Sequence, residues 1–154
     1  MIKRIDDFVS RFETKMRLDD ALIMKRQGRY FLLDENLRRL TSKDFYYVGA
    51  YLGETRDGEF FPSFNLLNML AERKANRIKV DKKTEWLFIC GRDVFRQGIT
   101  KVMGSTEEGD YMLVLNSHDE CLGFGRILRN LKVKRKGPAV ENILDVGDFL
   151  RRER

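Results

Sequence analysis

The sequence predicts an α+β protein, with a mixed α/β domain in its first half and a small barrel or sandwich of strands in its second half. Three observations lead to this prediction. Apolar residues recur at helical spacing near the N-terminus, and strand-like runs around tight turns follow them. After residue 80, short strand-like runs are separated by turn-prone segments such as GSTEEGD and NSHDE. The 154 residues suffice for one domain or two small ones.

The first half begins with an amphipathic helix, predicted over residues 3–16, where apolar residues recur every three or four positions. Two strands, ALIMK and RYFLL, then flank a glycine turn. Asp34 is in the position of an N-cap before the short helix ENLRRL. The run DFYYVGAYLGE at 44–54 is rich in aromatic and β-branched residues, which predicts another strand of an antiparallel sheet, followed by a turn at 56–58.

One more strand and a helix are predicted at the end of the first half. Phe60, Phe61 and Phe64 indicate the strand. Pro62 restricts this strand to a sheet edge or a bulge, because proline cannot donate a hydrogen bond to the ladder. Asn65 is predicted to cap the helix that follows, LLNMLAERK.

A change in composition predicts a domain boundary near residue 80. The run RKANRIKVDKK contains six basic residues, one acid and little apolar content. We therefore assign residues 1–80 to an N-terminal α/β domain and residues 81–154 to a second domain. In the second domain VFRQGITKV, YMLVL, CLGFGRIL and AVENILD predict strands, whereas TEWLFICG fits either a buried strand or a helix that ends at Gly91. DVGDFLRRER predicts a final helical turn.

Positive charge is concentrated in one stretch of the second half. The chain carries 30 Lys and Arg against 24 Asp and Glu, a net charge of +6, which is compatible with a polyanionic partner. The stretch GFGRILRNLKVKRKG, residues 123–137, contains no acid. Its six basic residues are Arg126, Arg129, Lys132, Lys134, Arg135 and Lys136.

The glycines of this stretch do not form a phosphate-binding loop. A dinucleotide loop needs a third glycine that opens a helix, and a Walker loop needs GxxxxGK followed by Ser or Thr. Neither pattern is present. Gly123 and Gly125 are expected instead to permit a bulge or a close backbone approach in a small barrel.

In residues 130–136 the polar residues Asn130, Lys132, Lys134 and Lys136 occupy alternate positions. Leu131 and Val133 lie between them, which predicts a strand with three lysines on one face. Alternate residues of a strand lie about 6.6 Å apart, so these lysines would match successive phosphates of an extended nucleic acid. The same pattern fits a solvated sheet edge, where lysines oppose aggregation. Both interpretations stay open on the local pattern.

Motifs for catalysis, metal binding and membrane insertion are absent from the sequence. There is no GxSxG or HExxH, His118 is the single histidine, and Cys90 and Cys121 lack metal-ligand spacing. No apolar run reaches eighteen residues, and no signal peptide is evident. We therefore expect a cytoplasmic protein that is not an enzyme, has reduced thiols, uses no cofactor or metal, and has no membrane partner. His118, in the segment NSHDE, is expected in a surface turn.

The order of segments in the second half resembles the PUA family, small RNA-binding pseudo-barrels named after pseudouridine synthase and archaeosine transglycosylase. The resemblance rests on EWLFICGRDVFRQGITKV, YMLVL, LGFGR and GPAVENILDVGDFLRR. It implies a C-terminal PUA-like β pseudo-barrel in which TEWLFICG is helical. The segments LGFGR and VGDFLRR, with RYFLLDENLRRL, YVGAYLG and FNLLNML in the first half, are similar to the Nip-seven family of archaeal type. That family acts in large-subunit assembly and pre-ribosomal RNA processing.

The resemblance implies an RNA-binding assembly factor of large ribosomal subunit biogenesis. Its expected partners are RNA, in particular pre-rRNA, single-stranded or structured, and other ribosome-assembly or exosome-like proteins. The expected RNA contacts are the basic PUA residues Arg126, Arg129, Lys132, Lys134, Arg135, Lys136, Arg151 and Arg152. Two alternatives stay open. The protein would be an RNA-binding accessory to a tRNA or rRNA modification enzyme of the pseudouridine or archaeosine type, or a protein adaptor in an assembly complex.

Overall fold

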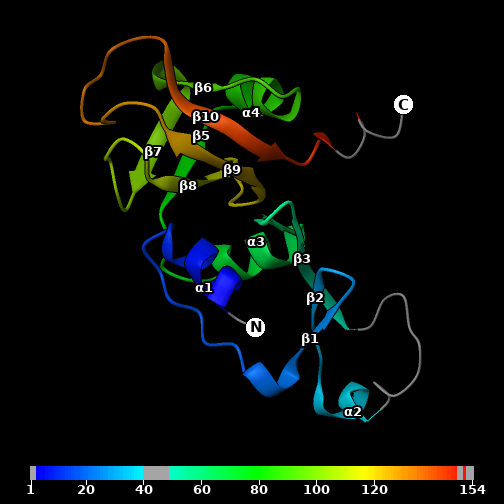
Figure 1. The fold of residues 1–154 in the computed structure, drawn as a ribbon. Helices are drawn as coiled ribbons and strands as arrows, with labels where there is room; N and C mark the ends of the chain where they lie inside the picture. The colour runs from blue at the N-terminus through cyan, green and yellow to red at the C-terminus, as the bar shows by residue number, and fades with distance from the viewer. Residues whose placement is uncertain (1–2, 40–48, 149–150, 152–154) are drawn as a thin grey trace.

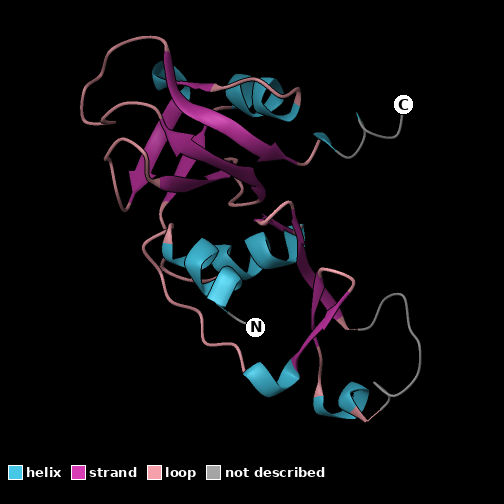
Figure 2. Cartoon of the chain, viewed as in Figure 1, coloured by secondary structure: helices cyan, strands magenta, loops and turns pink. Residues whose placement is uncertain are grey.

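Two sheets organise the protein in the computed structural model, which describes residues 3–39, 49–148 and 151 (Figures 1 and 2). Sheet A has the strand order β1-β2-β3-β4, and sheet B has the order β6-β10-β9-β8-β5-β7. Sheet A is antiparallel, and sheet B curls into a half-barrel. The predicted α+β fold, with an antiparallel N-terminal sheet followed by a β pseudo-barrel, is confirmed. None of the helices in the described ranges is long and apolar enough to cross a bilayer.

The first half contains sheet A and the helices that accompany it. Its elements are α1 (Lys3–Ser10), the 3-10 turn η1 (Asp20–Leu22), β1 (Ile23–Arg26), β2 (Arg29–Leu32), α2 (Glu35–Arg38), β3 (Ala50–Arg56), β4 (Glu59–Pro62) and α3 (Phe64–Ala71). The predicted hairpin and the short helix capped by Asp34 are confirmed, and the Asp34 carboxylate accepts a hydrogen bond from the Leu37 amide at 2.7 Å. Residues 44–48 of the predicted third strand lie outside the described residues.

The first helix is shorter than its apolar pattern predicts. It ends at Ser10, because Glu13 has a left-handed backbone with φ 54° that no continuing helix accommodates. Phe12 and Met16 are nevertheless buried, and they extend the apolar face of α1 without helical structure. The apolar pattern within residues 3–16 therefore coincides with buried residues, but the end of the helix that it predicts is wrong.

The cap of α3 differs from the prediction. Ser63, not Asn65, is the N-cap, and its hydroxyl accepts a hydrogen bond from the Leu66 amide at 3.2 Å. Phe64 accordingly belongs to α3 rather than to the preceding strand. That strand, β4, lies at an edge of sheet A, as Pro62 predicts.

The second half forms sheet B and packs one helix against it. Its elements are β5 (Arg77–Val80), α4 (Lys82–Ile89), β6 (Val94–Phe95), the 3-10 turn η2 (Arg96–Gly98), β7 (Ile99–Met103), β8 (Tyr111–Leu115), β9 (Cys121–Ile127) and β10 (Pro138–Asp145). TEWLFICG is helical, as the family resemblance implies. The Asp81 carboxylate caps α4 at 2.8 Å from the Thr84 amide, and Gly91 follows its end with φ 90°.

The predicted strand at 130–136 is wrong. Residues 128–137 form a loop between β9 and β10, which we call the basic loop. Leu131 is buried in the core of sheet B, whereas Val133 is 56% exposed. The Leu131 amide donates to the Thr106 carbonyl at 2.9 Å, and its own carbonyl accepts from Arg96 Nε at 2.9 Å. The alternation therefore reflects one buried anchor in a loop and not the two faces of a strand.

One apolar core joins the two halves. Ile5, Phe8 and Phe12 of the first half are in the same buried cluster as Leu113 and Phe124 of sheet B. A second cluster fills the half-barrel itself. The strand β5, which precedes the predicted boundary at residue 80, pairs with β7 and in parallel with β8. The division into residues 1–80 and 81–154 stays a prediction.

The two glycines of β9 allow β10 to approach closely. A Cβ atom on Gly123, which has φ 146°, would lie 1.9 Å from the Leu144 carbonyl oxygen. A Cβ atom on Gly125 would lie 2.2 Å from the Glu141 carbonyl oxygen. The β9–β10 register shifts between Asn142 and Leu144. Both the close approach and the bulge that the glycines predict are therefore present.

Candidate nucleic-acid interface

The basic loop leaves the top of sheet B in Figure 1 and returns to it. Backbone hydrogen bonds hold both of its ends. At its start the Leu128 amide donates to the Ala139 carbonyl at 2.9 Å, and at its end the Gly137 carbonyl accepts from the Arg96 amide at 2.9 Å. Leu131 anchors its middle in the core. The loop is therefore held at both ends and at one interior point, and the side chains between these points are displayed from a fixed base.

Arg129 stabilises the basic loop from inside. Its Nη2 atom donates to the Lys136 carbonyl at 2.8 Å and also to the Arg135 carbonyl. These bonds draw the end of the loop toward its beginning. A further local bond, from the Lys132 amide to Asn130 Oδ1 at 2.9 Å, fixes the turn beside Leu131. The guanidinium of Arg129 is thus engaged by the loop backbone.

Four cations of the basic loop are available to a partner. Lys132, Lys134, Arg135 and Lys136 are all exposed. None of their side chains forms a hydrogen bond or ion pair with another residue that the structure describes. Because the loop contains no acid, nothing within it neutralises this charge. The basic loop therefore presents four exposed cations on either side of the exposed Val133 in the sequence.

The remaining predicted contacts lie elsewhere. Arg126 Nη2 is 2.7 Å from Glu141 Oε2, in a cross-strand pair between β9 and β10. Arg151 Nη2 is 2.8 Å from the buried Asp145 carboxylate, and Arg151 Nη1 donates to the Ile89 carbonyl at 2.6 Å. The hydrogen bond with Asp145 raises the pKa of Arg151 further above its ordinary value. Arg151 therefore joins the C-terminal turn to α4. Arg152 lies outside the described residues.

Two exposed aromatic side chains of the second half, Phe95 beside the loop and Trp86 on α4, were not among the predicted contacts. Phe95 is 46% exposed and pairs across β6 and β10 with Pro138, which directly follows the basic loop. Trp86 is 68% exposed on the outer face of α4. The spacing of the buried Thr84 and Phe88 places Trp86 on the opposite side of the helix. This signal is present in the sequence once TEWLFICG is treated as a helix.

The described side chains show no arrangement of metal ligands. No group of three or more His, Cys, Asp or Glu residues in the described ranges is placed to hold a metal ion. His118 lies in an exposed turn between β8 and β9, as expected from the segment NSHDE.

The family of the protein follows from comparison with known sequences. Residues 76–154 match the model of the UPF0113 PUA domain. The chain belongs to the UPF0113 PUA domain family. A UPF0113 protein from Archaeoglobus fulgidus is 29% identical over 113 residues, which cover 71% of this chain and 64% of that protein. The chain therefore spans a little less than two thirds of the length of this relative.

Solved structures share the fold. A conserved PUA domain protein from Thermoplasma acidophilum superposes with a TM-score of 0.62 at 23% identity, covering 98% of this chain and 92% of that one. A hypothetical protein from Pyrococcus horikoshii gives a TM-score of 0.55 at 20% identity, covering 85% and 77%. A PUA domain from Aeropyrum pernix, crystallised with tartrate, gives 0.52 at 23% identity, covering 61% and 56%. PUA domains commonly bind RNA and are generally not catalytic.

Proposed function

We propose that this protein binds RNA through the basic loop of its PUA domain and acts as an assembly factor of the Nip-seven type in large ribosomal subunit biogenesis and pre-rRNA processing. The observation that supports RNA binding is the group of four exposed cations on an anchored loop that itself contains no acid. The assembly role is supported by the sequence resemblance described above.

Recognition by this loop should depend mainly on the RNA backbone. Lysine side chains contact phosphates as point charges, and such contacts position a nucleic acid without reading its sequence. Phe95, which lies beside the loop, offers an exposed ring on which an unpaired base can stack, an interaction that tolerates any base. We therefore expect a preference for RNA with unpaired bases next to the loop contacts, and little preference for sequence.

The salt dependence of RNA binding tests the role of the loop. Because Arg126 and Arg129 are engaged within the fold, four cations rather than six are available. For single-stranded RNA, each phosphate contact contributes a slope of about −0.7, so log K should fall against log salt with a slope of about −3. That slope corresponds to a loss of roughly fifty-fold in affinity between about 50 and 200 mM salt. An affinity that is flat across this range would contradict the proposal.

Variants separate loop contacts from general charge. Replacement of Lys132, Lys134 and Lys136 together by alanine should reduce the magnitude of the slope by about 2. A matched control replaces three exposed cations of the first half, Arg17, Arg38 and Arg39, by alanine. The control should leave the slope within error of the unmodified protein. Equal effects of the two triple variants would show that the loop is not the RNA site.

The assembly role needs a separate measurement. Ultraviolet crosslinking in extracts of the source cells, followed by sequencing of the bound RNA, should recover precursors of large-subunit rRNA. The crosslinked residues should include members of the basic loop. Recovery of tRNA or of modification-enzyme substrates in place of rRNA precursors would favour the accessory function and contradict the assembly role.

A further inference from the structure

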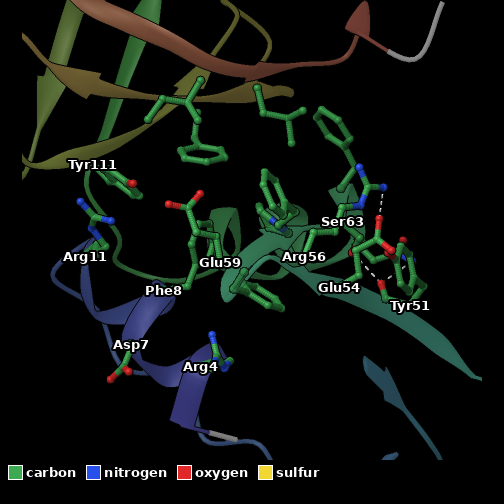
Figure 3. A pocket seen from close by; sticks show the side chains of 18 of the residues that line it. Arg4, Asp7, Phe8, Arg11, Tyr51, Glu54, Arg56, Glu59, Ser63 and Tyr111 are labelled. Atoms are coloured by element: carbon green, nitrogen blue, oxygen red, sulfur yellow. Dashed lines mark hydrogen bonds and ion pairs between the residues drawn. The ribbon is translucent and has the colours of Figure 1, made fainter. Parts of the chain in front are cut away.

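A cleft with an aromatic floor opens between the two halves of the protein (Figure 3). Its volume is about 740 Å³, and its walls come from α1, the β3–β4 hairpin, the start of α3 and strands β8 to β10. The Phe8 ring lies 5.5 Å from that of Phe60, 6.2 Å from that of Tyr111 and 5.4 Å from that of Phe124, measured between ring centroids. These packed rings make the floor rigid. We call this feature the aromatic cleft.

Two large apolar side chains remain exposed where the aromatic cleft meets solvent. Phe61 of β4 is 43% exposed, and Ile143 of β10 is 41% exposed. They come from different halves of the protein, so the exposed apolar surface crosses the junction. Exposed apolar groups that adjoin a concave site and are rimmed by polar residues are typical of an interaction surface.

Carboxylates outnumber arginines in the lining of the aromatic cleft, where Asp7, Glu54, Glu59 and Asp148 lie with Arg4, Arg11 and Arg56. Its arginines are already in contact with the fold. Arg4 donates to the Gly58 carbonyl, Arg11 stacks at 3.8 Å from the centroid of the Tyr111 ring, and Arg56 pairs with Glu54. By contrast, the carboxylates of Asp7 and Glu59 form no hydrogen bond or ion pair with any described residue. Both acids line the cleft, and Figure 3 shows the Asp7 carboxylate pointing away from the rings.

This charge distribution distinguishes between classes of partner. A nucleic acid would bring phosphates toward a lining in which carboxylates outnumber arginines by four to three, which disfavours its binding. A segment of protein with a large apolar side chain next to a cation satisfies both features, because the apolar group covers Phe61 and the cation pairs with Glu59. We propose that the aromatic cleft binds a protein segment in which a large apolar side chain is flanked by Arg or Lys.

The proposed protein site is separate from the proposed RNA site. In Figure 1 the basic loop leaves the upper end of sheet B, whereas α1 and β3, which line the aromatic cleft, lie below that sheet. The two surfaces have no residue in common. RNA and the protein segment should therefore bind at the same time without competing.

The proposal is tested with a defined peptide on the full chain. The probe is the pentapeptide GRWRG, capped at both ends, titrated into isotopically labelled protein while backbone amide shifts are recorded. We expect saturable shifts at residues that line the aromatic cleft. The peptides GEWEG and GRARG, which reverse the charge and remove the ring, should bind about tenfold more weakly or less. Absence of shifts at the cleft, or equal binding of GEWEG, would overturn the proposal.

Single substitutions at exposed positions locate the peptide. Phe61→Ala and Glu59→Lys should each weaken GRWRG binding about tenfold. Val133→Ala and Glu108→Lys are the matched controls, because they change an exposed apolar residue and an exposed acid away from the cleft. The controls should bind GRWRG as the unmodified protein does, and a loss equal to that of the cleft variants would contradict the assignment.

RNA binding is measured on the same variants. Phe61→Ala should retain the RNA affinity of the unmodified protein, and the triple lysine variant of the basic loop should retain its affinity for GRWRG. Failure of the RNA proposal would appear as an unchanged salt slope in the triple lysine variant, whether or not GRWRG binds. Displacement of GRWRG by single-stranded RNA would show that the cleft is an RNA site and would overturn the inference.

Discussion

Cys90 and Cys121 lie in different surroundings, which should make their reactivities unequal. Cys90 is exposed at the end of α4, whereas Cys121 is partly buried at the start of β9. Burial raises the pKa of the Cys121 thiol to about 11, so this group stays protonated near neutral pH. Iodoacetamide at about pH 8 should therefore label Cys90 and leave Cys121 unmodified until the protein unfolds. Peptide mass spectrometry measures both sites, and equal labelling of the native protein would contradict the expectation.

The raised pKa of Cys121 also predicts a loss of stability in alkali. In the unfolded chain the thiol ionises near pH 8.5, whereas in the folded protein it ionises only near the raised pKa of about 11. Between these values the unfolded state binds fewer protons, so the free energy of unfolding contributed by this group falls as pH rises. Cys121→Ala should flatten this part of the pH profile in urea titrations. An unchanged profile would mean that other groups dominate alkaline unfolding.

Two glycines with positive φ should differ widely in their tolerance of alanine. At Gly109, with φ 91°, a Cβ atom would meet nothing within 4 Å, so alanine should cost only about 1 kcal/mol of backbone strain. At Gly123 the same atom would collide with the backbone of β10, and the expected cost is about 3 kcal/mol or more. Urea unfolding of both variants measures the difference. Equal losses would show that β10 can move aside.

The contribution of the Leu131 anchor to the basic loop can be measured separately from the contribution of the loop's charge. Leu131 is buried, so Leu131→Ala should lower the free energy of unfolding by about 3 kcal/mol, whereas Val133→Ala should change it by less than about 0.5 kcal/mol. Leu131→Ala loosens the loop that displays the cations, so its RNA affinity should fall. Because the variant keeps every cation, the salt slope should change little. Chemical unfolding and the salt titration measure the two effects. A reduced slope in Leu131→Ala would mean that the anchor itself orders the phosphate contacts.

Local sequence signals predicted most of the helices and strands. They failed where residues far away in the sequence determine the conformation of a segment. The hairpin of β1 and β2, the cap at Asp34 and the edge position of Pro62 follow from neighbouring residues, and the structure contains all three. The strand β5 was not predicted, because its short run RIKV lies in a basic segment and obtains its partners from β7 and β8. The predicted strand at 130–136 is a loop because Arg96 and Thr106, far away in the sequence, bind the backbone of Leu131.

The same limit applies to the candidate site. The absence of acid in residues 123–137 identified the segment that carries four free cations. That Arg126 faces Glu141 depends on the register of β9 and β10, and that Arg129 closes the loop depends on where the loop turns. Neither fact is encoded in the spacing of the basic residues. The run of basic residues therefore predicts the position of the surface but overestimates the number of charges that it offers.

The shared core should make the two halves unfold together. Phe12 is fully buried, and its ring lies 5.7 Å from that of Phe124 in sheet B. Phe12→Ala should lower the free energy of unfolding by about 3 to 5 kcal/mol. Hydrogen exchange followed by mass spectrometry at increasing urea concentrations should show β2 and β9 losing protection at the same midpoint. Separate midpoints for the two strands would show that the halves are independent folding units.

The contact between Phe8 and Phe124 has a consequence for the nascent chain. The apolar face of α1 leaves the ribosomal exit tunnel early, while its aromatic partners on β8 and β9 have yet to be synthesised. N-terminal segments usually fold first during translation, but here the first helix cannot bury Phe8 against its final neighbours until β9 emerges. A translational pause or a premature stop between α3 and β8 would thus leave this face uncovered, in a form exposed to chaperones, proteases and aggregation.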